Sequence, residues 1–435
     1  MINNLNNLLV INKTLDLGQI LFFLGVFFLP TALPISGIFI LISLIISILK
    51  SNESPLEDRW NLPVFISIGL IIFSSLNISL INTPIALLEF DKSLIWINLF
   101  NWIPIFIGFW GFQTYLKTSE QRITFAKYLL AGSIPVLFSC IIQNWFEWHG
   151  PHQTLNGLIV WFQKPIRITG GTSGLFSNPN YAGIWLSLIL PFSLSLLHKE
   201  KTNNRNKFIL LSISSVVTYL IFLTNSRNAF FGFLISILFI YGIKKAFLTG
   251  IICFIVLQTI NAFIMLFSPE SEGFISFIPL NLISKISEIN FGLYNPRIII
   301  WRSAIYMISQ KPIWGWGAST FSFLYLGNNS PWKVPYSIID AQHSHNIALE
   351  LAHNFGIPTA SILIGSVFFL FIKAWRSIFF NQDSNNHSLF NKAWLASSAI
   401  VIFSHMSDIT YYDGKISLII CILFSGLRCL IRDNK

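Results

Sequence analysis

Residues 295–321 read NPRIIIWRSAIYMISQKPIWGWGASTF, and residues 340–358 read DAQHSHNIALELAHNFGIP. These two segments hold Arg297, Arg302 and three of the eight histidines. Most of the sequence on either side of residues 295–356 is apolar enough to be helix embedded in lipid. We therefore interpret the chain as a set of membrane helices built around one polar region.

The composition indicates an integral membrane protein. Of the 435 residues, 53% are hydrophobic, 15% are aromatic and only 11% are charged, and the mean hydropathy is +0.64. An ordinary soluble domain has about 25% charged residues. We predict an all-α polytopic membrane protein that forms a single integral membrane domain over residues 1–435. The expected spans, about twelve, are 17–30, 34–49, 63–82, 94–113, 123–142, 180–198, 207–224, 228–243, 246–267, 355–372, 393–410 and 415–431.

The lysines and arginines indicate the orientation of the spans, because cytoplasmic loops carry an excess of them. With both termini in the cytoplasm, twelve alternating spans place 18 of the 28 lysines and arginines on the cytoplasmic side. Two long loops, 143–179 and 268–354, then lie outside, and six of the eight histidines lie in or beside the external face. We therefore expect no nucleic-acid partner despite the net charge of +10, and we expect the chemistry on the external side.

The segment from Asn295 predicts a helix. Asn295-Pro296 is typical of a helix start, with Asn as N-cap and Pro in the first turn, and the helix should end near Gln310. Arg297 and Trp301 then share one face. Two interpretations remain open: an interfacial helix whose Arg contacts a carboxylate or a lipid headgroup, or an anion-binding site in which the guanidinium holds pyrophosphate.

The His343-Ser-His345-Asn346 segment is expected to lead into a further helix, on which Asn346, Glu350 and His353 share a face. Zinc binding, a structural role and general-base catalysis are three readings of these histidines. On a helix, positions i and i+2 diverge by about 200°. No third and fourth ligand stands nearby, so we expect no metal site. Imidazole titrates near neutral pH and can accept a proton from a sugar hydroxyl.

Four further segments are polar near the external face. Residues 312–317, PIWGWG, predict a tight turn that lets backbone pack closely. Arg227 lies in a short turn between two apolar runs, where a charge is costly and often functional. The glycine-rich segment 167–180 could present backbone N–H groups to an anion, and a simple loop cap explains it equally well. His405 and Asp408 are spaced i and i+3, as on one helical face.

Together these segments resemble a known family. RIIIW at 297–301, PIWGWG at 312–317 and HSHNIALE at 343–350 resemble the core signature of the O-antigen ligase and polymerase superfamily. Residues 167–180 and the turn TNSRNA at 224–229 resemble its upstream elements. By motif, the resemblance covers about residues 130–370.

The resemblance implies a GT-C-like fold with a large external catalytic loop, 268–354, between helices nine and ten. It also implies transfer of a glycan from an undecaprenyl-pyrophosphate carrier to a hydroxyl of a lipid or glycan acceptor. The reaction would take place on the periplasmic side of a bacterial inner membrane, in contact with membrane lipids and without nucleotide, metal or other cofactor.

The resemblance also assigns roles to residues. His345 would be the base that activates the acceptor, and Arg227 and Arg297 would hold the pyrophosphate, with Arg167 as a third candidate. Residues expected to support them are His343, Asn346, Glu350, Trp301, His405 and Asp408.

Two other functions remain open, a polymerase of the same superfamily and a membrane transporter. Polymerases share these motifs, so the acceptor is not specified. A branch of the superfamily in photosynthetic bacteria is associated with bicarbonate uptake, which would make the chain a transporter. Transporters place ionisable groups near mid-membrane, often at broken helices. In this sequence the middle of each span is apolar and the polar groups lie toward the external face, which favours an enzyme.

Overall fold

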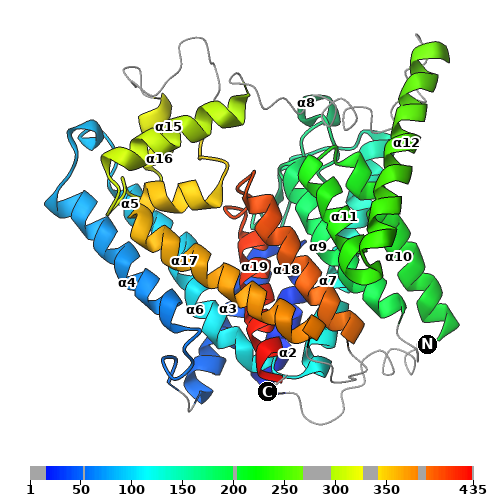
Figure 1. The fold of residues 1–435 in the computed structure, drawn as a ribbon, viewed down its shortest axis with the longest axis horizontal. Coiled ribbons are helices and arrows are strands. Elements are labelled where there is room, and N and C mark those ends of the chain that lie inside the picture. Colours follow the sequence, from blue (N-terminus) through cyan, green and yellow to red (C-terminus); the bar gives the residue numbers. More distant parts are fainter. Residues whose placement is uncertain are drawn as a thin grey trace.

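Helices account for nearly all of the regular structure. The computed structural model describes residues 16–51, 54–198, 203–267, 295–326, 341–380 and 388–433. In chain order the α-helices are α2 (Leu17–Phe28), α3 (Leu33–Lys50), α4 (Leu62–Leu76), α5 (Ser93–Ile97), α6 (Ile103–Gly111), α7 (Ser119–Phe146), α8 (Ile166–Thr169), α9 (Pro179–Leu197), α10 (Asn204–Leu223), α11 (Arg227–Tyr241), α12 (Ile243–Phe267), α15 (Pro296–Gln310), α16 (Thr320–Leu326), α17 (Ile347–Phe380), α18 (Ser388–His405) and α19 (Gly414–Asp433). Their arrangement is shown in Figure 1.

The chain is a multi-pass membrane protein. Within the described residues, eight helical segments are long and apolar enough to cross a membrane, and α2 and α11 are shorter apolar helices. Each of the twelve predicted ranges overlaps at least one helix. Twelve spans and a GT-C-like arrangement remain predictions. Helix α17 runs from Ile347 with a kink at Gly356, which lies next to the predicted start of the tenth range, and it continues to Phe380, beyond the predicted end at residue 372.

The helix ends follow local sequence signals. The first two predicted ranges are two separate helices, α2 and α3, that pack against each other as a hairpin. Ser36 of α3 donates a hydrogen bond to the Gly25 carbonyl of α2 at 2.7 Å, an approach that a residue without a side chain permits. Thr118 forms a capping box with Gln121 at the start of α7.

Helix α9 lies at the centre of one half of the molecule. It contacts α7, α10, α11 and α18, and almost every residue along it is buried. It begins at Pro179, and Asn178 caps it. In Figure 1 this group lies to the right, while α4, α15, α16 and the first turns of α17 lie to the left. The N-terminal end of α9 is therefore positioned by packing along its whole length.

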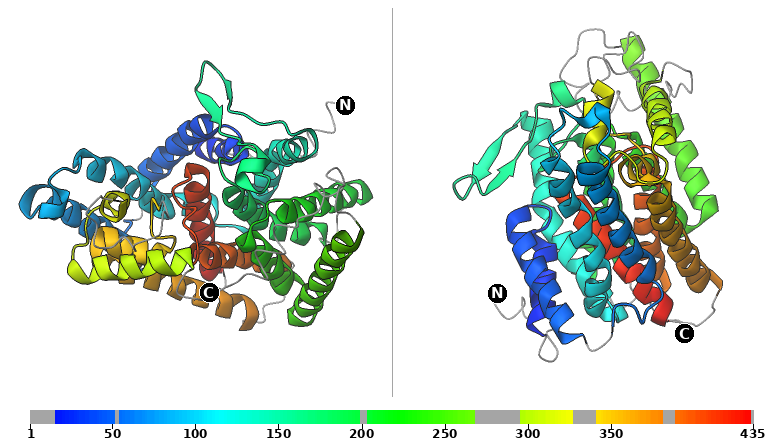
Figure 2. Two further views of the ribbon diagram at one scale, coloured as in Figure 1. Left: turned by 90° about the horizontal axis from the view of Figure 1, so that it is seen from above. Right: turned by 90° about the vertical axis from the view of Figure 1, so that its left-hand side faces the viewer.

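The first long loop contains a structure that the all-helical prediction did not include. Strands β1 (His152–Thr154) and β2 (Ile159–Trp161) pair antiparallel, with His152 opposite Trp161. Figure 2 shows this hairpin projecting from the helices. Its Trp161 indole donates to the Thr31 carbonyl at 2.7 Å. In the second long loop, residues 268–294 and 327–340 lie outside the described residues, and the remainder holds α15, α16, the segment 341–346 and the first turns of α17.

The glycine-rich turn at 312–317 packs directly on α17, as its sequence predicted. Gly315 and Gly317 both have positive φ, and the Trp316 and Gly317 amides donate to the carbonyls of His353 and Asn354. Helix α17 is kinked at this level, because Gly356 has φ +87°. A Cβ on Gly356 would overlap the Ile313 carbonyl. Only glycine suits this contact, which fixes the first turns of α17 against the turn.

The contact predicts that Gly356→Ala destabilises the protein by about 1–3 kcal/mol, since it adds a Cβ at a left-handed φ and against a backbone carbonyl. The measurement is the thermal unfolding midpoint in detergent micelles. Gly365→Ala is the matched control on the same helix, because no atom lies within 4 Å of its Cβ position. Equal midpoints for the two variants would contradict this account.

Candidate active site

His345 lies on a tight turn immediately before α17. It has φ +52°, a strained conformation for a residue with a side chain. Asn346 follows and caps the helix: its Oδ1 accepts hydrogen bonds from the Ala348 and Leu349 amides at 3.0 and 3.2 Å. The expectation that His343 and His345 diverge was wrong, because neither is helical. Their ring centroids lie 4.4 Å apart.

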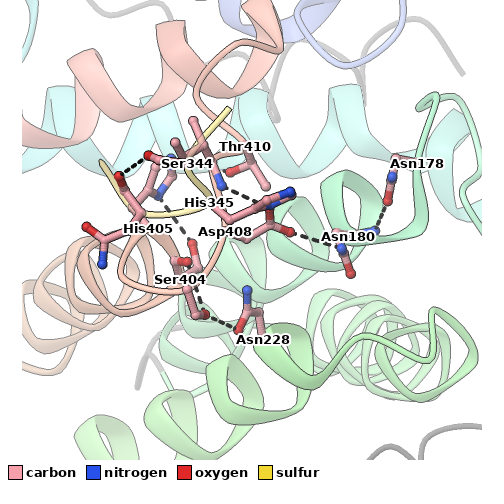
Figure 3. Close-up of polar contacts among 12 residues, drawn as sticks. Asn178, Asn180, Asn228, Ser344, His345, Ser404, His405, Asp408 and Thr410 are labelled. Atoms are coloured by element: carbon pink, nitrogen blue, oxygen red, sulfur yellow. Dashed lines mark hydrogen bonds and ion pairs between the residues drawn. The ribbon is translucent and has the colours of Figure 1, made fainter. Parts of the chain in front are cut away.

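His345 is hydrogen-bonded to Asp408. The distance from His345 Nδ1 to Asp408 Oδ1 is 3.0 Å. Asp408 Oδ1 also accepts from the Ile409 amide at 2.9 Å, and its Oδ2 accepts from Asn180 Nδ2 at 3.0 Å. Figure 3 shows Asp408 between His345 and Asn180. Both carboxylate oxygens therefore have donors, which come from three separate parts of the chain.

Asp408 is ionised at neutral pH although it is only 6% exposed. Burial raises its pKa, but the hydrogen bond from His345 and the charges of His345, Arg297 and His343 outweigh burial and hold the pKa below its ordinary value. A carboxylate accepts and cannot donate, so Nδ1 of His345 carries the proton. In the tautomer that carries its single proton on Nδ1, the Nε2 atom has a lone pair that can accept a proton, and the side chain is 30% exposed.

The helix that was expected to carry both His405 and Asp408 ends earlier. Helix α18 stops at His405, and Asp408 lies in the turn that follows. Asn346 Nδ2 donates to the Met406 carbonyl at 2.9 Å, and Ser407 Oγ donates to Asn228 Oδ1 at 2.9 Å. These bonds join the turn after α18 to the starts of α17 and α11.

A second buried carboxylate, Glu350, fixes the same histidine turn. Its Oε2 accepts hydrogen bonds from the amide and the hydroxyl of Ser344, both at 3.0 Å. Its Oε1 accepts from the Tyr412 hydroxyl at 2.8 Å and from Asn354 Nδ2 at 3.3 Å. Ser344 lies between the two histidines, so Glu350 and Asp408 together define the position of His345.

Arg297 lies within electrostatic range of Asp408, and Arg227 lies within electrostatic range of Arg297. Arg297 is in the first turn of α15, where Asn295 Oδ1 caps its amide at 3.0 Å as the sequence predicted. Burial lowers the pKa of Arg297, the Asp408 charge opposes this, and the Arg227 charge adds to it. Within the described residues, the Arg297 guanidinium has no hydrogen bond or ion pair, and a partly buried charge of this kind favours an anionic ligand.

Arg227 follows the turn at 223–225, which is held by a second loop at 170–172. Nothing in the sequence indicated that these two loops are in contact. Gly171 and Thr172 pack against the turn at 223–225: the Thr172 amide donates to the Leu223 carbonyl at 3.0 Å, and Asn225 Nδ2 donates to the Gly170 carbonyl at 2.7 Å. The idea that this loop presents amides to an anion is not supported for Ser173 and Gly174, whose amides both donate to Gln143 Oε1 at 2.9 Å. The loop-cap interpretation describes this segment.

Two buried donors near the arginine and the histidine pair lack partners within the described residues: Trp301 Nε1, one helical turn from Arg297, and His343 Nδ1. Burial and the neighbouring His345 lower the pKa of His343, against the opposite effect of Glu350 and Asp408. His343 is therefore neutral at neutral pH. Unsatisfied polar atoms of this kind are costly unless a ligand or water reaches them.

Within the described residues, neither Arg167 nor His405 makes a hydrogen bond with His345, Asp408 or Glu350, although the Asp408 charge acts on His405. Arg167 is exposed and lies 3.6 Å from the exposed Glu147 carboxylate. His405 is buried, with Nδ1 2.9 Å from the Val401 carbonyl and Nε2 3.4 Å from the Thr410 hydroxyl. In the described residues, no three His, Cys, Asp or Glu side chains are grouped so as to hold a metal ion.

Sequence reasoning did not single out Asn180, Ser344 or Asn354 as site residues. The sequence signal for Asn180 was weak. Asn180 follows the N-cap Asn178 and Pro179, so its presence was explained by the start of a helix. Its partner Asp408 is 228 residues away.

Glu350→Gln is predicted to lower stability by about 1–3 kcal/mol, since either orientation of the amide places its NH₂ against a donor that then loses its acceptor. Tyr412→Phe removes a hydroxyl that donates to Glu350 at 2.8 Å and accepts from Asn354 Nδ2 at 3.4 Å, but it leaves the other three donors to Glu350 in place and should cost less. Thermal unfolding of both variants in detergent measures this. A Glu350→Gln midpoint at or above that of Tyr412→Phe would contradict the assigned bonds.

The lowered pKa of Asp408 predicts that the stability of the folded protein depends on pH. Because its pKa in the folded state lies below the ordinary 3.8, its ionised form stabilises the fold above that value, and this is lost as pH falls through the folded-state pKa. The midpoint difference between wild type and Asp408→Asn should therefore be largest near pH 7 and shrink below about pH 4. Ser407→Ala removes a hydrogen bond but no ionisable group, so its difference should not follow pH. A constant Asp408→Asn difference from pH 7 to pH 3 would refute the prediction.

Comparison with known protein families gives a match in the middle of the chain. Residues 209–364 match the O-antigen ligase family, a range that contains Arg227, Arg297, His343 and His345 and excludes Asn180 and Asp408. The comparison with curated proteins gave no match. Family members are enzymes of polysaccharide assembly that use lipid-linked glycans. Residues 209–364 of this multi-pass membrane protein are therefore similar to the O-antigen ligase family.

Proposed function

We propose that this protein transfers a glycan from an undecaprenyl-pyrophosphate carrier to an acceptor hydroxyl at the site formed by His345, Asp408, Arg297 and Arg227. The observation that carries the proposal is the His345–Asp408 hydrogen bond at 3.0 Å beside Arg297. A base and an anion-binding group are the two parts that the reaction needs.

The proposed base is Nε2 of His345. Asp408 fixes the proton on Nδ1 and stabilises the ring when it becomes positively charged, as an aspartate does for a catalytic histidine in other hydrolytic and transfer enzymes. The acceptor hydroxyl gives its proton to Nε2, and its oxygen forms a bond to the anomeric carbon. General-base catalysis of this kind contributes about 10²–10⁴ in rate.

The leaving group is the lipid pyrophosphate. The bond between the anomeric carbon and the pyrophosphate oxygen breaks, and the electron pair stays on that oxygen. Arg297 and Arg227 lie where they can stabilise the added negative charge, and a guanidinium offers two parallel donors to phosphate oxygens. Arg167 is the weakest of the three arginines, since it is exposed and lies beside Glu147.

The proposed location is the external face of a bacterial inner membrane, with both termini in the cytoplasm. The site groups come from the N-terminal ends of α9, α11, α15 and α17 and from the turn between α18 and α19. A lipid acceptor corresponds to a ligase and a glycan acceptor to a polymerase, and the arrangement fits either. No metal is required by the proposed steps, because the arginines bear the leaving-group charge.

Transfer in proteoliposomes tests the proposal, with an undecaprenyl-pyrophosphate glycan as donor, lipid and glycan acceptors in separate assays, and EDTA present. His345→Ala and Asp408→Asn are expected to lower the rate about 10²–10⁴-fold, and Arg297→Ala about 10²–10³-fold. His198→Gln is the control histidine, since His198 lies at the opposite end of α9 from Asn180.

Two results would overturn the proposal. Wild-type rates in His345→Ala and Arg297→Ala would remove these residues from the site. No transfer to any acceptor, together with bicarbonate flux in the same vesicles, would identify the chain as a transporter.

A further inference from the structure

The hairpin of β1 and β2 presents an uncharged and largely apolar surface. Residues 148–163 read WHGPHQTLNGLIVWFQ and contain no Lys, Arg, Asp or Glu. Three of its apolar side chains are more than half exposed: Leu155 at 59%, Leu158 at 56% and Phe162 at 60%. Neighbouring exposed apolar groups of this kind mark a surface that contacts a membrane or another molecule.

The two faces of the hairpin differ in what they contact. Ile159 is buried, and the Trp161 indole donates to the Thr31 carbonyl in the turn between α2 and α3. Successive side chains of a strand point to opposite faces, so Val160 and Phe162 lie on the outer face, and both are exposed. The inner face therefore packs on the helices, and no described part of the chain covers the outer face.

The tip of the hairpin carries leucine at a position that the backbone does not favour. Leu155, Asn156 and Gly157 have φ of +49°, +53° and +86°. Glycine and asparagine adopt this left-handed conformation readily, whereas leucine does so at a cost. The turn itself does not call for the apolar side chain of Leu155, so a contact outside the chain is the better explanation for it.

The base of the hairpin is fixed at the ends of two membrane-length helices. The hairpin follows the last turn of α7 and rests on the turn before α3, and both helices are long and apolar enough to cross a membrane. Gln163 Nε2 donates to Ser139 Oγ at 3.1 Å, and Gln143 Nε2 donates to the Lys164 carbonyl at 2.9 Å. These bonds attach the base of the hairpin to α7.

The tip projects past the helices. Seen from above in Figure 2, the hairpin extends beyond α2 and α3, and in the side view its tip slopes down toward the end of these two helices. A tip in this place overhangs the lipid that surrounds the helices.

The exposed apolar side of α7 continues into the hairpin. Phe138, Trp145 and Phe146 of α7 are 61%, 53% and 74% exposed, and Trp148 follows at 46%. Tryptophan is enriched where a membrane meets water. A glycan hydroxyl placed against the tip leucines would lose its water without gaining a hydrogen bond. The surface therefore suits lipid better than sugar.

We propose that the hairpin inserts its tip into the glycerophospholipid leaflet at this end of the helices, with Leu155 and Leu158 at the boundary between headgroups and acyl chains. Apolar side chains gain free energy when they leave water, and the insertion requires no charge to leave it. The segment that follows the hairpin contacts the turn at 223–225 and leads to Asn180. An anchored hairpin thus holds the candidate site at a fixed height above the membrane.

Nitroxide labels measure the depth of the tip in the full chain, in vesicles of phosphatidylethanolamine and phosphatidylglycerol. Leu155→Cys and Leu158→Cys are compared with Phe138→Cys on the exposed side of α7 and with Glu147→Cys, whose side chain is 75% exposed. The wild type gives the background labelling of the native cysteines. The accessibility of each label to oxygen and to a water-soluble nickel chelate gives its depth.

We expect the labels at 155 and 158 to lie about 5–10 Å below the lipid phosphates, the label at 138 to lie deeper, and the label at 147 to lie in water. Tip labels as accessible to the chelate as the label at 147 would overturn the proposal. Immobilisation of water-exposed tip labels by added glycan would assign the hairpin to sugar. Spin–spin broadening that dilution with unlabelled protein removes would assign it to a second copy.

A second measurement uses the unaltered protein, in case the cysteine variants fail to fold. Phosphatidylethanolamine with a photoreactive diazirine in its acyl chain is cross-linked in the same vesicles, and the labelled residues are mapped by mass spectrometry. Labelling of residues 155–162 together with α7 would support the proposal. Labelling of α3 and α7 without any label in residues 148–163 would overturn it.

Discussion

The ionised carboxylate of Asp408 is the interaction on which the arrangement of the site depends. A buried charge is tolerated only when each lone pair has a donor or a nearby opposite charge. Asp408 meets this condition with donors from α9, from the turn before α17 and from its own turn, and with the charge of Arg297. Satisfying one carboxylate therefore fixes the relative position of three segments that are far apart in the sequence.

Glu350 is a second buried carboxylate with donors to both oxygens, and it binds the histidine turn from the other side. It accepts four hydrogen bonds, two of them from Ser344. The left-handed backbone of His345 is unfavourable by itself, so it persists because both carboxylates and the Asn346 cap determine it. The result is a histidine whose Nδ1 and backbone are fixed while its other ring nitrogen is available.

The fold was predictable where the signal is local. The start and end of α15 followed from Asn295-Pro296 and Pro312, and the turn at 312–317 followed from its glycines. Helical ranges followed from runs of apolar residues. The hairpin of β1 and β2 was missed, because two strands of three residues each give no clear pattern of alternation.

The candidate site was predictable in part. His345, Arg227 and Arg297 stood out as polar residues beside apolar runs, and Asp408 was expected only as a supporting residue. The contacts that give these residues their chemistry were beyond a reading of the sequence, because the partners are distant: Tyr412 lies 62 residues from Glu350, and Asn180 lies 228 residues from Asp408. The helical geometry assumed for residues 343–345 does not hold, because His345 itself has a positive φ and α17 begins only at Ile347.

The match to the O-antigen ligase family ends at residue 364, whereas Asp408 and Asn180 lie on either side of the matched range in the chain. The candidate site therefore includes residues outside the part of the chain that sequence comparison matches. Chimaeras that exchange only residues 209–364 between relatives would combine a histidine from one parent with an aspartate and an asparagine from the other. Exchanges that aim to transfer acceptor preference should carry the start of α9 and the turn between α18 and α19 with the matched range.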